Sequence, residues 1–207
     1  GEISHSGFRD LLIDVKSNIL NFNVLNTNSK DNDLFYGEAY ASGEVSFYGT
    51  PKNLKISANA VTNKNTKIFI PLSDESSSEV KDYISFVDFS DTLSIINQAV
   101  VEKDLKGLEL DFVLDVTPDA YFELIFDINS GDIIRGRGDG DIKLTVNTEG
   151  DFSMFGDYEI KEGAYNFTLY NIINKEFEII PGSRITWYGD PYKAVLDIEA
   201  NYSQLVS

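Results

Sequence analysis

Apolar and polar residues alternate along four separate segments of this chain. The segments are residues 54–60, 108–116, 120–126 and 142–146. Successive side chains of a β-strand point to opposite faces, so this pattern predicts strands with one apolar and one polar face. One dry face and one wet face are typical of an antiparallel sheet rather than of a parallel sheet covered on both sides.

Short segments with turn chemistry separate these strands. Proline stands at Thr117-Pro118-Asp119, glycine occurs in residues 129–132 and 147–150, and Pro181-Gly182 suits the central pair of a type II turn. Strands joined by such short turns form successive hairpins. The sequence therefore predicts an all-β fold, a long antiparallel-type hairpin sheet, with residues 1–207 as a single domain.

Residues 73–106 do not follow the alternating pattern and are expected to form an irregular acidic insertion. Residues 73–78 are polar and acidic, which predicts a loop. Residues 90–106 could hold a short helix with Leu93, Ile96 and Val100 on one face, or an irregular crossing. Residues 83–89 suit a helix or a strand, and their aromatic and β-branched content favours the strand.

The charge balance argues against nucleic acid as a partner. The chain has 17 Lys and Arg against 34 Asp and Glu, a net charge of −17. Binding to phosphate backbones needs clustered cations, which are missing here. We therefore expect no nucleic-acid partner.

The residue inventory also argues against an enzyme. The chain has no cysteine and one histidine, His5, so it offers no thiol nucleophile, no Ser-His-Asp triad and no histidine-based zinc site. Two same-face carboxylate pairs, Asp111 with Asp115 and Asp197 with Glu199, are expected on solvated strand faces. We expect no catalysis, no metal and no cofactor.

The glycine-rich segment 136–141 could suggest a phosphate loop, a calcium loop or an Arg-Gly-Asp tripeptide. No helix pattern follows it, and it lacks the distal glutamate of a calcium loop. We interpret it as a glycine-rich hairpin that lets neighbouring strands come close.

Residues 156–202 carry an ordered motif. Gly156 to Phe167 read G-x-Y-x-I-x-x-G-x-Y-x-F, with a glycine turn expected at residues 161–163, and Gly182 to Pro191 read G-S-x-I-x-W-x-G-D-P. A final alternating strand follows, up to Tyr202. Together these residues resemble the C-terminal domain of the TamB family, which belongs to the AsmA-like group. The pattern fits well from about Gly107 onward, with Gly150, Gly163, Gly182 and Gly189 setting the turns.

The resemblance implies a location and a function. TamB-like proteins are anchored in the inner membrane and span the periplasm of bacteria with an outer membrane, and their folded sheet encloses a hydrophobic groove for phospholipid. No apolar run here reaches the roughly 20 residues that span a bilayer, and residues 1–10 do not resemble a signal peptide. The expectation is therefore a periplasmic piece of a longer protein, with the anchor outside this segment.

The predicted groove is lined by the apolar face of the strands. Only one weak helix is predicted, so no helical layer is available to cover that face, and a sheet folded into a taco-like or half-open barrel would hide it from water. Acyl chains suit such an interior because each buried methylene contributes about 0.8 kcal/mol. The expected lipid contacts are Phe112, Leu114, Phe122, Leu124, Phe126, Ile142, Leu144, Phe152, Met154, Tyr165, Phe167, Leu169, Phe177, Ile179, Trp187, Leu196 and Ile198.

Two other functions stay open at this point. The family is also implicated in assembling outer-membrane β-barrel proteins, which would use a free strand edge at Lys193–Tyr202 to bind a TamA- or BamA-type partner. A β-sandwich adhesin or carbohydrate-binding module, with Tyr188 and Tyr192 as an aromatic platform, would instead have a core filled by side chains.

Overall fold

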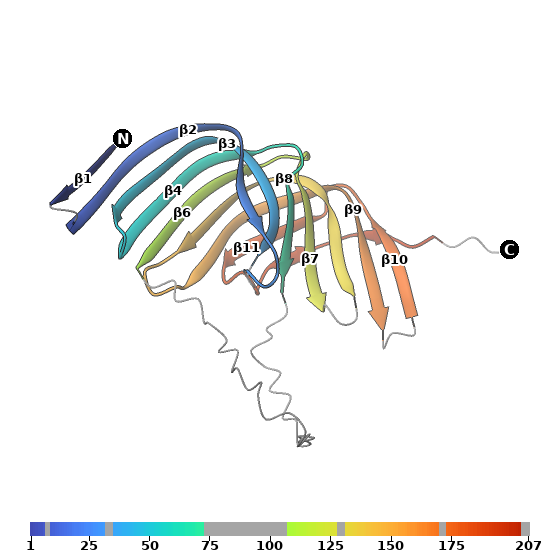
Figure 1. Ribbon diagram of the computed structural model, residues 1–207. Coiled ribbons are helices and arrows are strands. Elements are labelled where there is room, and N and C mark those ends of the chain that lie inside the picture. The colour runs from blue at the N-terminus through green and yellow to red at the C-terminus, as the bar shows by residue number, and fades with distance from the viewer. Residues whose placement is uncertain (7–8, 32–34, 73–106, 128–130, 170–172, 204–207) are drawn as a thin grey trace, which may run out of the picture. The chain divides into compact units, whose positions relative to one another are not determined.

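The computed structural model describes residues 1–6, 9–31, 35–72, 107–127, 131–169 and 173–203 (Figure 1). Within these residues the chain forms one 13-stranded sheet, which confirms the predicted all-β class. The predictions made for residues 73–106 lie outside the described residues.

Long strands alternate with short ones along the chain. The strands are β1 (Glu2–Ser6), β2 (Arg9–Thr27), β3 (Tyr36–Thr50), β4 (Asn53–Thr62), β5 (Lys67–Pro71), β6 (Leu108–Val116), β7 (Tyr121–Asp127), β8 (Asp132–Val146), β9 (Phe152–Leu169), β10 (Ile173–Ile179), β11 (Arg184–Gly189), β12 (Val195–Asp197) and β13 (Ala200–Asn201).

Most neighbouring strands pair antiparallel, as predicted, but two pairs are parallel. Strand β4 runs parallel to β6, and β5 runs parallel to β7. Parallel neighbours need a long connection. Residues 72–107 provide one, because they carry the chain from the end of β5 to the start of β6.

Strands β3 and β8 each hold two partners along the same edge. Strand β2 pairs with one edge of β3, so β4 and β5 share the other edge, at residues 41–50 and 36–38 respectively. Strand β8 likewise gives one edge to β9 and the other to β6 and β7. The hydrogen-bonded order β3-β4-β6-β8-β7-β5 therefore returns to β3, so that six strands form a closed barrel to which the others are added.

This arrangement divides the sheet into two walls that meet at a bend. The first wall contains β4, β6, β11 and β12, and the second contains β5, β7, β10 and β13. Strands β2, β3, β8 and β9 run through both walls. The other strands are interrupted at the bend by corners at residues 63–66, 117–120, 180–183 and 198–199.

Hydroxyl side chains complete the hydrogen bonds of these corners. The buried Thr66 hydroxyl accepts from Tyr40 N–H and donates to Tyr40 C=O, both at 3.0 Å. At the next corner Thr117 N–H donates to the Thr62 hydroxyl at 2.9 Å, and the Thr117 hydroxyl donates to Thr62 C=O at 3.1 Å. Because a corner removes backbone partners, these side chains take their place.

The glycines confirm some predicted turns and correct others. Gly150 lies in a turn closed by its N–H to Asn147 C=O, and Gly182 has the positive φ of 97° that a type II turn requires. Residues 136–141 lie inside β8 and Gly163 lies inside β9, so the hairpin and the turn predicted there are wrong. The predicted close approach is confirmed, because a Cβ at Gly138 would lie 2.1 Å from Glu159 O.

Replacing Thr66 by valine tests the role of the corner hydroxyls. Thr66→Val keeps the shape of the side chain but removes the hydroxyl partner of the part-buried Tyr40 N–H, while Tyr40 C=O keeps its hydrogen bond from Asn63 N–H. We therefore expect a loss of about 1–3 kcal/mol of unfolding free energy in urea. Thr145→Val, on the polar face of β8, is the matched control and should change it little. Equal unfolding midpoints for the two variants would contradict this role.

Candidate functional site: the interior face of the sheet

Cross-strand pairing aligns the inward side chains of the first wall into rows that run across the strands. Directly paired residues of neighbouring strands share one face. One row consists of Val15, Phe47, Ile56, Leu110, Val146 and Phe152. A second row consists of Ile19, Gly43, Ala60, Leu114, Ile142, Gly156 and Trp187.

One end of this interior is a packed core. Its buried residues come from both walls and form one cluster: Leu124, Ile134, Ile142, Met154, Tyr158, Ile160, Ile179, Ile185 and Trp187. All belong to β7 through β11, so the walls pack against each other at this end of the strand order. Burial on this scale is the main favourable contribution to holding the bend closed.

The rows become less buried toward β2. Val15, Phe47, Ile56 and Leu110 are half-buried. Phe22 is paired with the inward Ala41 and is 58% exposed. We call the inward residues of β2, β3, β4 and β6 the open half of the interior. The interior is thus mostly apolar, with Ser17 and Thr62 on the same face. Its large buried side chains belong to the C-terminal strands, although the small residues Ala41 and Ala60 are buried as well.

The predicted lipid contacts divide between these two parts. Leu124, Ile142, Met154, Ile179 and Trp187 are members of the packed core, and Phe122, Phe126, Leu144, Tyr165 and Ile198 pack against it. Phe112, Leu114, Phe152, Phe167 and Phe177 are half-buried, and Leu196 is exposed beside Ile185. The side chain of Leu169 lies outside the described residues.

Sequence reasoning missed the inward residues of β2 and β3. Val15, Val45 and Phe47 share the face of the predicted residues but were not among them. The signal was present, because these residues alternate with polar or small neighbours. Glycines at inward positions such as Gly43 and Gly49 interrupt the apolar pattern and conceal it.

The packing of β9 explains the first half of the motif. Gly156 has φ 123°, and a Cβ there would lie 2.0 Å from Asp141 O, so only glycine fits. A Cβ on Gly138 would lie 2.9 Å from Cζ of Tyr158, which places the tyrosine ring against β8. The same ring meets Phe122 edge to face at a centroid distance of 4.7 Å. The motif residues therefore join β8, β9 and the second wall.

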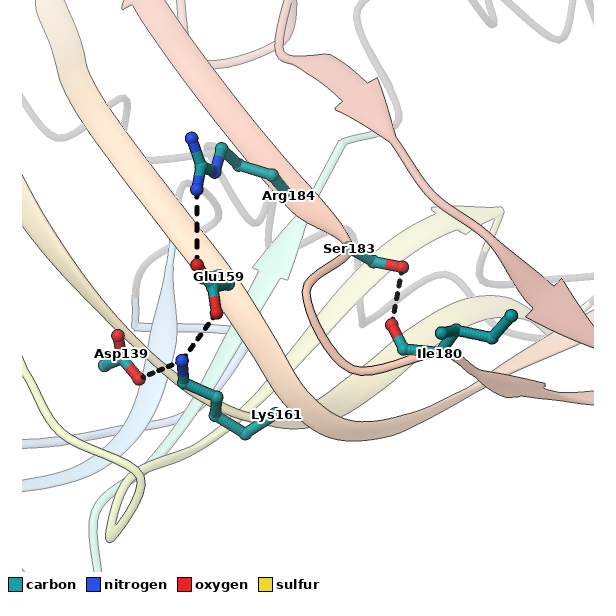
Figure 2. Close-up of polar contacts among 6 residues, drawn as sticks. All are labelled: Asp139, Glu159, Lys161, Ile180, Ser183 and Arg184. Carbon is teal, nitrogen blue, oxygen red and sulfur yellow. Dashed lines mark hydrogen bonds and ion pairs between the residues drawn. The ribbon is translucent and has the colours of Figure 1, made fainter.

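The opposite face of the same strands carries charge. Figure 2 shows Lys161 between Asp139 and Glu159, at 3.1 and 2.5 Å, with Arg184 3.2 Å from Glu159. Hydrogen bonds from Lys161 and Arg184 lower the pKa of Glu159. In the part of the chain that the structure describes, no group of three or more His, Cys, Asp or Glu could hold a metal ion.

The Tyr158 hydroxyl is a polar group enclosed in the packed core. The residue is 5% exposed, and its hydroxyl has no hydrogen-bond partner among the described residues. Burial raises the pKa of Tyr158, and the Asp139 carboxylate adds to this. Because a buried hydroxyl without a partner loses its hydration, it opposes folding.

Removing this hydroxyl should stabilise the protein. Tyr158→Phe keeps the ring contacts, so we expect a gain of about 1 kcal/mol in urea unfolding at neutral pH.

Above about pH 10 an unfolded tyrosine loses its proton while the folded one, with its raised pKa, keeps it, so folding stability falls as the pH rises. Tyr158→Phe should make this fall less steep. The exposed Tyr188→Phe should leave the neutral-pH midpoint unchanged, and destabilisation by Tyr158→Phe would show that its hydroxyl has a partner.

Comparison with known proteins places the chain in a family. The sequence model of one family, the TamB C-terminal domain, matches residues 1–205. No curated protein and no solved structure matches the chain. Among the described residues no helix is long and apolar enough to cross a membrane. The matched family is a component of the bacterial envelope, associates in general with TamA-like partners and is not known for catalysis. The match covers essentially the whole chain, and the chain belongs to the TamB C-terminal domain family.

Proposed function

We propose that this domain is a non-catalytic, periplasmic lipid conduit that carries phospholipid between the inner and outer membranes. The observation that carries the proposal is the mostly apolar interior, whose rows extend from β2 to β9 and whose large side chains on β2, β3, β4 and β6 (Val15, Phe47, Ile56 and Leu110) are only half-buried. Acyl chains need apolar surface and no fixed polar partner, with about 0.8 kcal/mol for each buried methylene.

The proposal narrows the set of lipid contacts. Core members such as Met154 and Trp187 pack against other side chains, so they support the wall rather than offer a surface. Phe112 and Leu114 lie on the same face and are half-buried, and they continue the rows of the open half. Lipid contact is therefore assigned to these residues together with Val15, Phe47 and Ile56.

Two phenylalanines on opposite faces provide a matched test. A photo-crosslinking phenylalanine analogue at Phe112 faces the interior, and the same analogue at Phe155 faces outward on β9, where the native side chain is 43% exposed. We expect phospholipid crosslinks at position 112 and not at 155, measured by mass spectrometry after expression in a bacterium with an outer membrane. Absence of lipid at position 112 would contradict the conduit, and equal labelling at both positions would show non-specific contact.

A second candidate function is assembly of outer-membrane β-barrel proteins through a strand edge. Strand β12 pairs with β11 on one side and is exposed along its whole length, with Val195 at 54%. An exposed edge strand can add a strand from a partner. The partner proposed for this edge is a TamA- or BamA-type protein, because the family associates in general with TamA-like partners. The two functions are compatible because they use different surfaces.

Crosslinking also tests this second function. The photo-crosslinking residue at Val195 should capture a TamA- or BamA-type barrel in cells. The matched control is Val113, which is exposed but lies on β6 between β4 and β8, where no edge is free. Barrel adducts at Val113 equal to those at Val195, or none at either position, would contradict edge binding.

A further inference from the structure

One row of paired residues joins the half-buried side of the interior at β2 to the packed core at β11. The row begins at Ile19 on β2, crosses the small residues Gly43 and Ala60, and ends at Gly156 and Trp187. Gly43 and Ala60 present little side chain to the interior, and Ala60 is itself buried, whereas Trp187 presents a large indole at the C-terminal end of the row. Trp187 is 4% exposed, against 58% for the inward Phe22 at the other end of the interior.

The closed end is completed by the last described part of the chain. Trp187 Nε1 donates to Pro191 O at 3.2 Å, and Ala194 and Ile198 pack against the core. Strand β12 pairs with β11 of the first wall, and β13 pairs with β10 of the second wall. We call residues 191–201 the closing segment, because they connect both walls at the end of the strand order.

Ser183 attaches the closing segment at the bend. Its buried hydroxyl lies 2.8 Å from Ile180 O and 3.2 Å from Glu199 O, and it accepts a hydrogen bond from Glu199 N–H at 3.0 Å (Figure 2 shows the contact with Ile180). Ile180 N–H donates to Glu199 O at 2.8 Å. The closing segment is thus held by backbone and side-chain hydrogen bonds as well as by apolar packing.

We infer that the interior is a blind groove, open toward β2 and plugged at the C-terminal strands by Trp187 and the closing segment. This inference rests on the proposed function and specifies where lipid binds. Acyl chains occupy the open half and stop before Trp187. Onward transfer of lipid at the closed end then requires residues 191–201 to separate from β10 and β11.

The width of the open half is comparable to the length of an acyl chain. Four strand-to-strand steps separate β2 from β8 through β3, β4 and β6, and at about 4.8 Å each they span roughly 19 Å. One leaflet of a bilayer has a hydrocarbon thickness of roughly 15 Å, half of about 30 Å. A single acyl chain lying along the rows from β2 is therefore short enough to end before Trp187.

The single tryptophan of the chain makes the inference measurable. Vesicles of phosphatidylcholine brominated in mid-chain quench a tryptophan that approaches the bromine atoms, and unbrominated vesicles serve as the blank. In the wild-type protein the fluorescence of Trp187 should stay unchanged. In the double variant Trp187→Phe, Phe47→Trp the only tryptophan lies in the open half, and its fluorescence should be largely lost.

The outcomes separate failure of the blind groove from failure of the lipid function. If Trp187 of the wild-type protein is quenched as strongly as a tryptophan at position 47, the groove is not closed at Trp187, but lipid binding in the interior is still supported. No quenching at either position, together with no lipid crosslink from a photo-crosslinking residue at Phe47 in the protein that keeps Trp187, would overturn the conduit and with it this inference. The crosslinking experiment at position 47 keeps Trp187 and the native core, so it still tests the proposal if the double variant fails to fold.

Discussion

The bend of the sheet is the constraint on which the rest of this structure depends. A strand that crosses a sharp bend loses backbone hydrogen bonds, and a buried group left without a partner costs about 1–3 kcal/mol. The chain meets this constraint in two ways. Strands β2, β3, β8 and β9 continue through the bend, and β3, β8 and β9 carry glycine where neighbouring backbones come too close for a Cβ. The other strands stop at corners, where Thr66, Thr117 and Ser183 supply the missing partners.

The bend determines what the apolar face can do. In a flat sheet that face would be exposed and prone to association. Folding turns the two walls toward each other, and at the C-terminal strands the walls meet closely enough to bury Ile160, Ile179 and Ile185. Toward β2 the same face remains half-buried. One fold therefore provides a packed core and a half-buried apolar surface, which is the combination that the proposed lipid conduit needs.

Glycine shows why part of this architecture could be predicted and part could not. Gly150 and Gly182 lie in turns, as predicted, because a polar or proline neighbour marks each of them as a turn. Gly138 and Gly163 lie inside strands, where glycine serves close approach to a neighbouring strand. The two uses look alike in a sequence. The parallel pairs β4–β6 and β5–β7 could not be predicted either, because pairing across the long connection 72–107 depends on the bend rather than on local residues.

The sequence by itself determined that the chain forms strands and which face of most strands points inward. It also determined that the chain has no cysteine and a single histidine, so that it lacks the residues for thiol chemistry or a histidine-based zinc site. These properties are local, because alternation and residue type act within one strand. Only the tertiary structure decided which inward residues are accessible. Phe112 and Trp187 both looked like groove residues, yet one is half-buried in the open half and the other is enclosed. Accessibility depends on how closely the two walls approach, and that distance is set by contacts between strands far apart in the chain.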